Sequence, residues 1–158
     1  TKGGSYINEE EKRIILEILD DLKATRELKG LDIGIITGYS GQKELLRKSI
    51  KATGLDKIAS KIDINTLDAF QGRENDIIIY STVRTRDSIG FQKEKERVNV
   101  AFSRAKKLLI VCGDKDFFYN FDDQDNKFVE IIDYISESKE CEIIQCDGGK
   151  LFERESNS

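Results

Sequence analysis

Three short apolar runs constrain the fold of this chain more than any other feature of its sequence. They are LDIGIIT at 31–37, IIIYSTV at 77–83 and LLIVC at 108–112. Their brevity and their β-branched residues predict buried strands. The segment 62–67 alternates apolar and polar residues, which also predicts a strand. Such runs are typical of a mainly parallel sheet that is covered on both faces.

Amphipathic helices are predicted between these strands. Asn8 followed by Glu11 has the pattern of a capping box, and apolar residues then recur at helical spacing, which predicts a helix to about Leu28. Further helices are expected at 42–53, 94–105 and 127–137, a turn at 38–41, a short helix or turn at 117–121, and a last edge strand at 142–146. The predicted class is therefore α/β, with three layers in the order helix, sheet, helix.

Composition limits the chemistry. The 158 residues are 38% hydrophobic and 35% charged, which fits one well-solvated globular domain. The three cysteines form no CxxC pair and the chain has no histidine, so we expect no metal site, and Ser-His-Asp and Cys-His catalysis are excluded within it. No apolar run approaches the ~20 residues that span a bilayer. We expect an intracellular, cytoplasmic location without membrane contact.

The charge is unevenly distributed. The chain has a net charge of −4, yet residues 84–107 contain eight basic and three acidic side chains. Residues 108–158 contain five basic and thirteen acidic ones. A basic island in an acidic chain favours a local anion site, although chance clustering on a solvated surface would look the same.

Three segments carry unusual chemistry. GYSGQ and DAFQGRE follow predicted strands, where ligands bind in parallel sheets. The third segment is expected to be helical, with Arg97, Ala101 and Arg104 on one face and Val98, Phe102 and Ala105 on an adjoining inward face. Two forked guanidiniums on one stripe suit a bulky anion such as a triphosphate. Solvated arginines on an amphipathic helix are the alternative interpretation.

The three segments together resemble motifs IV, V and VI of Upf-like superfamily 1 helicases. They read IITGYSGQ, INTLDAFQGRENDIIIYSTVR and RVNVAFSRAKKLLIVCGD, and the resemblance covers about residues 30–115. It implies a RecA-like fold of the P-loop NTPase type and the second of two motor domains. We expect this domain to span residues 1–147 and to be followed by a loose polar tail at 148–158.

The resemblance also implies roles for single residues. Arg104 would be an arginine finger that reaches the γ-phosphate of ATP held by the first motor domain. The residues assigned to the nucleotide are Tyr39, Gln42, Lys43, Gly72, Glu74 and Arg97. The residues assigned to single-stranded DNA or RNA are Thr66, Asp68, Gln71 and Arg84.

Some features depart from the family pattern. Gly38 replaces a proline, and Lys43 stands where some members have a second finger arginine, although a lysine cannot fork. The chain has no GxxxxGK[ST] phosphate loop and no acidic pair at a strand end. ATP and Mg²⁺ are therefore expected to be held mainly by a first RecA-like domain of the same polypeptide, and this chain alone should not hydrolyse ATP.

Two other functions fit the same residues. The chain could be a nucleic-acid-binding module that kept the helicase fold without a motor role. It could also be an independent α/β enzyme that acts on phosphorylated metabolites, with Arg97 and Arg104 as anion clamps.

Overall fold

Four parallel strands in the order β2-β1-β3-β4 form the central sheet. The strands are β1 (Asp32–Thr37), β2 (Lys61–Thr66), β3 (Asn75–Ser81) and β4 (Ala105–Cys112). The computed structural model describes residues 5–24, 30–59, 61–70, 73–88, 90, 95–122, 126–147 and 150–151. For residues 95–97, 147 and 150–151 it describes the backbone only.

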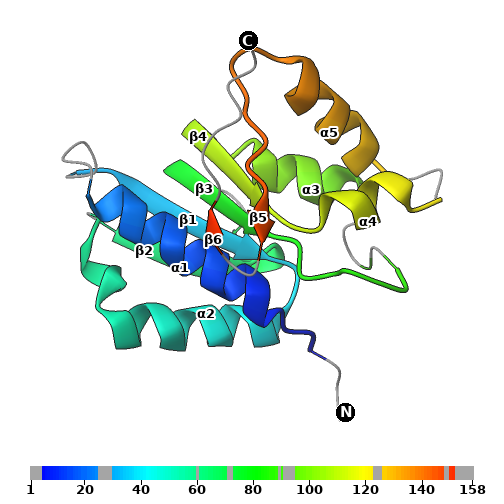
Figure 1. Ribbon diagram of the computed structural model, residues 1–158. Helices are drawn as coiled ribbons and strands as arrows, with labels where there is room; N and C mark the ends of the chain where they lie inside the picture. Colours follow the sequence, from blue (N-terminus) through cyan, green and yellow to red (C-terminus); the bar gives the residue numbers. More distant parts are fainter. Residues whose placement is uncertain are drawn as a thin grey trace.

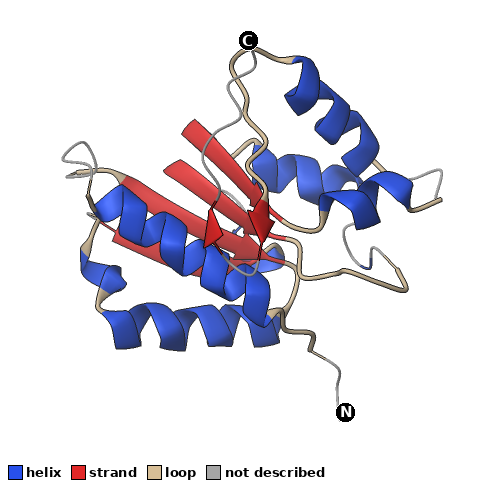
Figure 2. Ribbon diagram, viewed as in Figure 1, coloured by secondary structure: helices blue, strands red, loops and turns tan. Residues whose placement is uncertain are grey.

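Helices cover both faces of this sheet (Figures 1 and 2). One layer consists of α1 (Glu9–Lys23) and α2 (Ser40–Thr53), and the other of α3 (Lys95–Phe102), α4 (Lys115–Asn120) and α5 (Phe128–Glu137). The remaining elements are the short turns η2 (Leu55–Lys57) and η3 (Asp68–Phe70) and the hairpin of β5 (Cys146–Asp147) and β6 (Lys150–Leu151). The structure thus confirms the predicted α/β class and has the three layers of a RecA-like fold.

The alternation of side chains along the strands produces two separate cores. In β3, Ile77 and Ile79 pack under α1 and α2, whereas Ile78 and Tyr80 pack under α3, α4 and α5. All four are buried. Because burial of one such side chain stabilises the fold by roughly 1.5–3 kcal/mol, an apolar strand with both faces covered belongs at the centre of the sheet.

The predicted capping box at the start of α1 forms only in part. The Asn8 side chain accepts a hydrogen bond from the backbone N–H of Glu11, as expected of an N-cap. The Glu11 side chain does not return to the Asn8 backbone, whose N–H donates to Gln42 instead. Glu11 is buried and points to the end of β3. Contacts with residues distant in the sequence have therefore replaced the local bond expected between the Glu11 side chain and the Asn8 backbone.

Several predicted boundaries were wrong. Helix α2 begins at Ser40, so the turn expected at 38–41 is shorter. Helix α3 ends at Phe102, because Ala105 already pairs with Asn75 in the sheet. No strand forms across 142–145, and Cys146 pairs with Leu151 in a small antiparallel hairpin. That hairpin enters the tail expected to be loose, and most of the tail lies outside the described residues.

In the part of the chain that the structure describes, no helix has the length and apolarity needed to cross a membrane.

Candidate functional site

The predicted site residues divide between the two edges of the sheet. Because the strands are parallel, their carboxyl ends share one edge and their amino ends share the other. The register aligns Thr37 with Thr66 and with Ser81, so the loops after β1, β2 and β3 begin side by side at the carboxyl edge. At the amino edge, the Asn75 N–H donates to the carbonyl of Arg104 over 3.0 Å, which joins the starts of β3 and β4.

This division separates the residues predicted to bind the nucleotide. Tyr39, Gln42 and Lys43 lie at the carboxyl edge, because they follow β1. Glu74 lies at the amino edge, because it immediately precedes β3. A strand of seven residues, as in β3, separates the edges by about 20 Å. The structure therefore does not bring these residues into one pocket.

Arg104 does not lie on the helix where sequence reasoning placed it. It occupies the turn between α3 and β4, where its N–H donates to Ala101 over 3.2 Å. The Ser103 hydroxyl donates to the Val100 carbonyl over 2.8 Å and closes the end of the helix. Ala101 is buried in the core and does not share an exposed stripe with the arginine. The pairing of β4 with β3 ended the helix earlier than its periodicity predicts.

The Arg104 side chain contains an unsatisfied donor. Its Nε is buried and has no hydrogen-bond partner among the described residues. The residue as a whole is half-buried. A buried N–H without a partner is costly, and such a group in a folded protein calls for an unseen acceptor. An anion at the amino edge would supply that acceptor.

Two other charged residues, Arg73 and Glu74, precede β3 at the amino edge. Glu74 is exposed at the start of β3. Arg73 forms an ion pair with Asp63 of β2 over 2.6 Å, with about half of the arginine side chain exposed. The amino edge therefore offers a carboxylate and two guanidiniums, of which only Arg73 has a carboxylate partner in the described chain. This arrangement suits a ligand that combines anionic groups with hydroxyls.

At the carboxyl edge, by contrast, the predicted residues Gln42 and Tyr39 contact other parts of the protein. Gln42 is completely buried, and its amide bonds the Asn8 backbone and the Ser81 hydroxyl. Tyr39 is 4% exposed and packs edge-on against Tyr6, with ring centroids 5.4 Å apart. These side chains hold the loop after β1 to the protein and are not free to contact a ligand.

Lys43, Thr66 and Asp68 lie nearer the surface. The Lys43 ammonium is 3.4 Å from Glu44, and its side chain is 22% exposed. Thr66 ends β2 half-buried, and Asp68 begins the exposed turn η3. Gln71 and Gly72 lie outside the described residues, and of Arg97 the structure describes only the backbone, in α3.

Glu11 is the most unusual charged group at the carboxyl edge. Its carboxylate accepts hydrogen bonds from the hydroxyls of Ser81 and Thr82 and from the Val83 N–H, the last at 2.9 Å from each oxygen. Burial raises the pKa of Glu11 from 4.5 to about 7, while the hydrogen bonds from Ser81, Val83 and Thr82 oppose the increase. A carboxylate with several donors is thereby built into the interior, at the end of the central strand.

The chain after β3 makes two turns with unusual backbone angles. Val83 has φ +68° and Asp87 has φ +69°. Each is the centre of a hydrogen bond between its neighbours: the Arg84 N–H donates to Thr82, and the Ser88 N–H donates to Arg86, both over 2.8 Å. These are γ-turns with positive φ, a rare and strained conformation. A β-branched residue such as Val83 strongly disfavours it.

Arg84 binds its own loop. Its Nε donates to the Ser88 carbonyl over 2.9 Å, and its Nη2 donates to the Arg86 carbonyl and the Ser88 hydroxyl, each over 3.2 Å. Its guanidinium carbon lies 4.1 Å from the centre of the Tyr6 ring. Only 7% of the residue is exposed, whereas 88% of the Arg86 side chain is. Arg86, and not the predicted Arg84, is the arginine that this loop presents to solvent.

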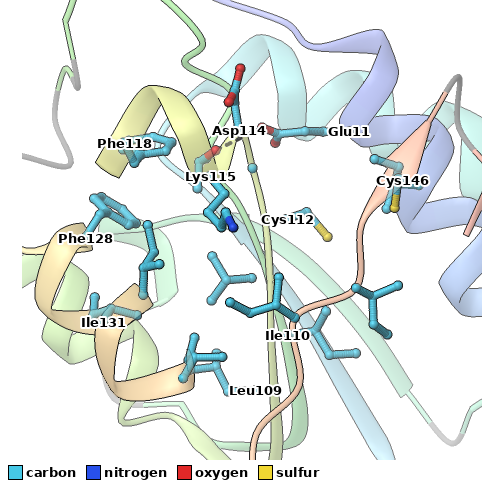
Figure 3. Close-up of a pocket in the computed structure, with 18 of the residues that line it drawn as sticks. Glu11, Leu109, Ile110, Cys112, Asp114, Lys115, Phe118, Phe128, Ile131 and Cys146 are labelled. Carbon is cyan, nitrogen blue, oxygen red and sulfur yellow. Dashed lines mark hydrogen bonds between the residues drawn. The ribbon is translucent and has the colours of Figure 1, made fainter. Parts of the chain in front are cut away.

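A large open groove lies beside β4, with a volume of 1810 Å³. Figure 3 shows Phe118 and Phe128 on one side of it and Cys146 on the other. Burial raises the pKa of the Cys112 and Cys146 thiols, which keeps them protonated and weakly reactive. The groove is lined by none of the residues predicted for the nucleotide.

Sequence reasoning missed Glu11 and Arg86. Glu11 was assigned to a local cap, and its spacing from Asn8 gave no sign of a partner about seventy residues away. Arg86 lies two residues after the end of the segment that resembles motif V, inside the basic island. Its place in that cluster of basic residues was the only signal that the sequence offered.

Comparison with known proteins identifies the family. Residues 1–116 match a family model described as an AAA domain. An uncharacterized ATP-dependent helicase of Methanocaldococcus jannaschii is 37% identical over 144 residues, which are 89% of this chain and 20% of that protein. Helicase SEN1 of Saccharomyces cerevisiae is 41% identical over 119 residues, 71% of this chain and 5% of that protein.

A third relative comes from an animal. The regulator of nonsense transcripts 1 homolog of Drosophila melanogaster is 41% identical over 116 residues, which are 70% of this chain and 10% of that protein. The chain thus spans a fifth or less of the length of these curated relatives. The matched family and the relatives together show that the chain belongs to the AAA domain family and is a helicase domain of superfamily 1.

Proposed function

We propose that this chain is the second motor domain of an ATP-dependent DNA or RNA helicase, and that Arg104 is its arginine finger. The observation that carries the proposal is the buried Arg104 Nε without a partner among the described residues. It lies at the amino edge, next to Glu74 and in the segment that resembles motif VI. A group that completes a neighbouring domain's phosphate site is expected to lack a partner in its own domain.

The two edges suggest a division of labour. The amino edge, with Arg104 and Glu74, would face ATP held by a first RecA-like domain, and Arg97 would support the same cleft. The carboxyl edge, with Thr66, Asp68 and the loop after β3, would face the nucleic-acid strand. This division differs from the sequence-based expectation, which assigned Tyr39, Gln42 and Lys43 to the nucleotide together with Glu74. Tyr39 and Gln42 then serve the structure of the nucleic-acid edge.

The chemistry assigned to Arg104 is electrostatic. During phosphoryl transfer, negative charge is spread over the oxygens of the transferring group, and a planar guanidinium can donate two parallel hydrogen bonds to them. The turn at residues 103–104 is held by backbone bonds to α3 and β3, so the donor needs little reorganisation when the domains close. Glu74 would accept hydrogen bonds from the ribose hydroxyls.

ATP and Mg²⁺ would be held mainly outside this chain. The sequence has no phosphate loop, and no group of three or more His, Cys, Asp or Glu side chains able to hold a metal occurs among the described residues. When bound by a first motor domain, Mg²⁺ would neutralise charge on the phosphates. The isolated chain is therefore expected to be inactive as an ATPase.

Arg104→Ala, made in the protein as the cell produces it, tests this function. We expect kcat for ATP hydrolysis to fall by about 10³, with little change in KM, because the finger acts on charge that develops in the transition state. Arg104→Lys keeps the charge without the fork and should recover only a small part of the rate. Arg13→Ala is the matched control, because Arg13 lies on the surface of α1 and pairs with Glu10. A kcat within twofold of wild type for Arg104→Ala would remove the assignment.

A further inference from the structure

The backbone at Val83 needs support from outside its own turn. Its side chain is buried, its φ is positive, and valine gains nothing locally from that angle. Backbone strain of this kind costs about 1–3 kcal/mol and persists only where the surroundings enforce it. Asparagine or glycine would adopt the angle more easily, so the turn must be held by its contacts.

Two residues at the start of α1 provide those contacts. Both oxygens of the Glu11 carboxylate accept a hydrogen bond from the Val83 N–H, and the Asn8 side-chain amide donates to the Val83 carbonyl over 3.1 Å. Both backbone polar groups of Val83 are therefore bound by residues at the start of α1. Glu11 also accepts hydrogen bonds from the hydroxyls of Ser81 and Thr82, so it fixes the end of β3 and the residue that follows it.

Arg84 then fixes the second turn. Once Val83 has turned the chain, the Arg84 guanidinium donates to Arg86 and Ser88, on either side of Asp87. Its Nε and Nη2 donors are used within the loop, and the guanidinium lies over the Tyr6 ring. The Arg86 side chain projects to solvent, 88% exposed, with its Nε 4.0 Å from the Asp87 carboxylate, which is 79% exposed.

We propose that Glu11 is a positioning residue: acting through Val83 and Arg84, it holds the loop at 82–88 so that the Arg86 guanidinium contacts a backbone phosphate of the nucleic-acid strand. The inference rests on the proposed function, because the strand is the ligand assigned to the carboxyl edge. Glu11 itself contacts no ligand. Since a flexible arginine loses side-chain entropy on binding, a loop that is already fixed binds a phosphate more tightly.

The experiment compares six variants in the protein as the cell produces it, one of them the double change Glu11→Ala with Arg86→Gln. Glu11→Ala removes all acceptors from the turn, and Glu11→Gln retains one oxygen for the Val83 N–H. Glu11→Ala with Val83→Gly removes the support and the disfavoured side chain together. Arg86→Gln removes the phosphate contact, and Glu10→Ala is the control, because Glu10 lies on the same helix turn but its carboxylate is exposed and pairs with Arg13.

Two quantities are measured for each variant. One is the affinity for oligothymidylate and oligouridylate over a series of salt concentrations. The other is hydrogen exchange of the peptide that covers residues 80–88. We expect Glu11→Ala to weaken binding roughly fivefold, to lower the salt slope by about one, and to speed exchange in this peptide. Glu11→Gln should fall between Glu11→Ala and wild type, and Glu10→Ala should match wild type.

The double changes distinguish positioning from general destabilisation. Glycine adopts positive φ readily, so Val83→Gly should restore most of the affinity lost in Glu11→Ala. Arg86→Gln should match Glu11→Ala in affinity and slope without faster exchange. Glu11→Ala added to Arg86→Gln should cause no further loss. If Glu11→Ala does not fold, as judged by thermal unfolding, Glu11→Gln takes its place in each comparison with a smaller expected loss, roughly twofold.

Binding by Glu11→Ala equal to wild type at every salt concentration would overturn the proposal. So would an equal further loss in the Arg86→Gln background, because Glu11 would then act by another route. If the wild-type protein binds neither oligonucleotide, the proposed function fails. The exchange data would then still decide whether Glu11 holds the turn, since unchanged exchange in Glu11→Ala would reject that part independently.

Discussion

The amino and carboxyl edges of this sheet differ in how their buried polar side chains are hydrogen-bonded. At the amino edge, Arg104 carries a buried donor for which the described chain provides no acceptor. At the carboxyl edge, Glu11 and Gln42 are buried as whole residues, and each binds several partners. Arg104 thus has an unfilled donor, whereas the Glu11 and Gln42 side chains are satisfied by the protein itself. A residue that completes the ligand site of another domain is expected to lack a hydrogen-bond partner in its own domain. A surface that must be rigid before its ligand binds is expected to have its polar groups bonded to one another.

The largest expected effect separates the two edges by function. Arg104→Ala should lower ATP turnover by about 10³ and leave the affinity for a single strand within twofold of wild type. Arg86→Gln should weaken binding of the single strand and leave ATP turnover at a saturating strand concentration unchanged. The kcat for ATP hydrolysis and the Kd for the single strand are measured on the same preparation of each variant. If Arg104→Ala weakens strand binding as much as Arg86→Gln does, the edges are not separate sites.

The pH dependence of stability should report the buried carboxylate of the carboxyl edge. Because the pKa of Glu11 is raised from 4.5 to about 7, the folded chain binds this proton more tightly than the unfolded chain. The corresponding stability is fully present below pH 4.5 and is lost as the pH rises to about 7. Glu11→Gln lacks this proton. We therefore expect the free energy of unfolding of wild type relative to Glu11→Gln to fall by about 3 kcal/mol over that range.

Chemical denaturation of both proteins at several pH values measures this difference. Other groups titrate equally in the two proteins, so the difference isolates Glu11. A difference that does not change with pH would show that the carboxylate is solvated, and the closed network at this edge would lose its support.

A methyl group at residue 113 should disturb the carboxyl edge alone. A Cβ added to Gly113 would lie 2.5 Å from the Thr82 hydroxyl, which donates to Glu11. Gly113→Ala should destabilise the fold by about 1–3 kcal/mol, because Thr82 must move and its hydrogen bond breaks. Thermal unfolding measures the loss. Gly30→Ala is a poor control because Gly30 has φ +90°, whereas Gly38→Ala adds a Cβ in ordinary contact and should cost less.

The smallest effect is expected at the amino edge. Asp63→Asn removes the charge that pairs with Arg73, whose side chain is 53% exposed, whereas that of Asp63 is 14% exposed and also accepts from Asn65. Because water screens the arginine and asparagine keeps an acceptor, the free energy of unfolding should fall by about 1 kcal/mol. A loss larger than this would mean that the amino edge, too, is held by a closed polar network.

The sequence predicted the sheet well and the site only in part. Strands β1, β2 and β3 lie within two residues of their predicted bounds, because β-branched apolar runs at the sheet centre leave few alternatives. The start of β4 was missed, since AKK is polar and its pairing with β3 is a tertiary event. Arg104 was therefore placed on a helix that ends before it.

The same limit explains Glu11. Helical spacing and capping patterns report neighbours three or four residues apart, and Glu11 was interpreted by that rule. Its real partners are about seventy residues away, at the end of β3. Positive φ at a valine is also invisible to any pattern, because valine is the residue least expected there. Local rules fail at the carboxyl edge because distant contacts override them.

The most direct test is a crystal structure of the natural polypeptide with a non-hydrolysable ATP analogue and a single strand bound. The division of the two edges predicts that the Arg104 guanidinium lies within hydrogen-bond distance of the γ-phosphate. It also predicts that the strand crosses the loops at 66–68 and 82–88, with Arg86 against a phosphate. A nucleotide bound beside Tyr39 and Gln42, or an Arg104 side chain directed into solvent, would contradict it.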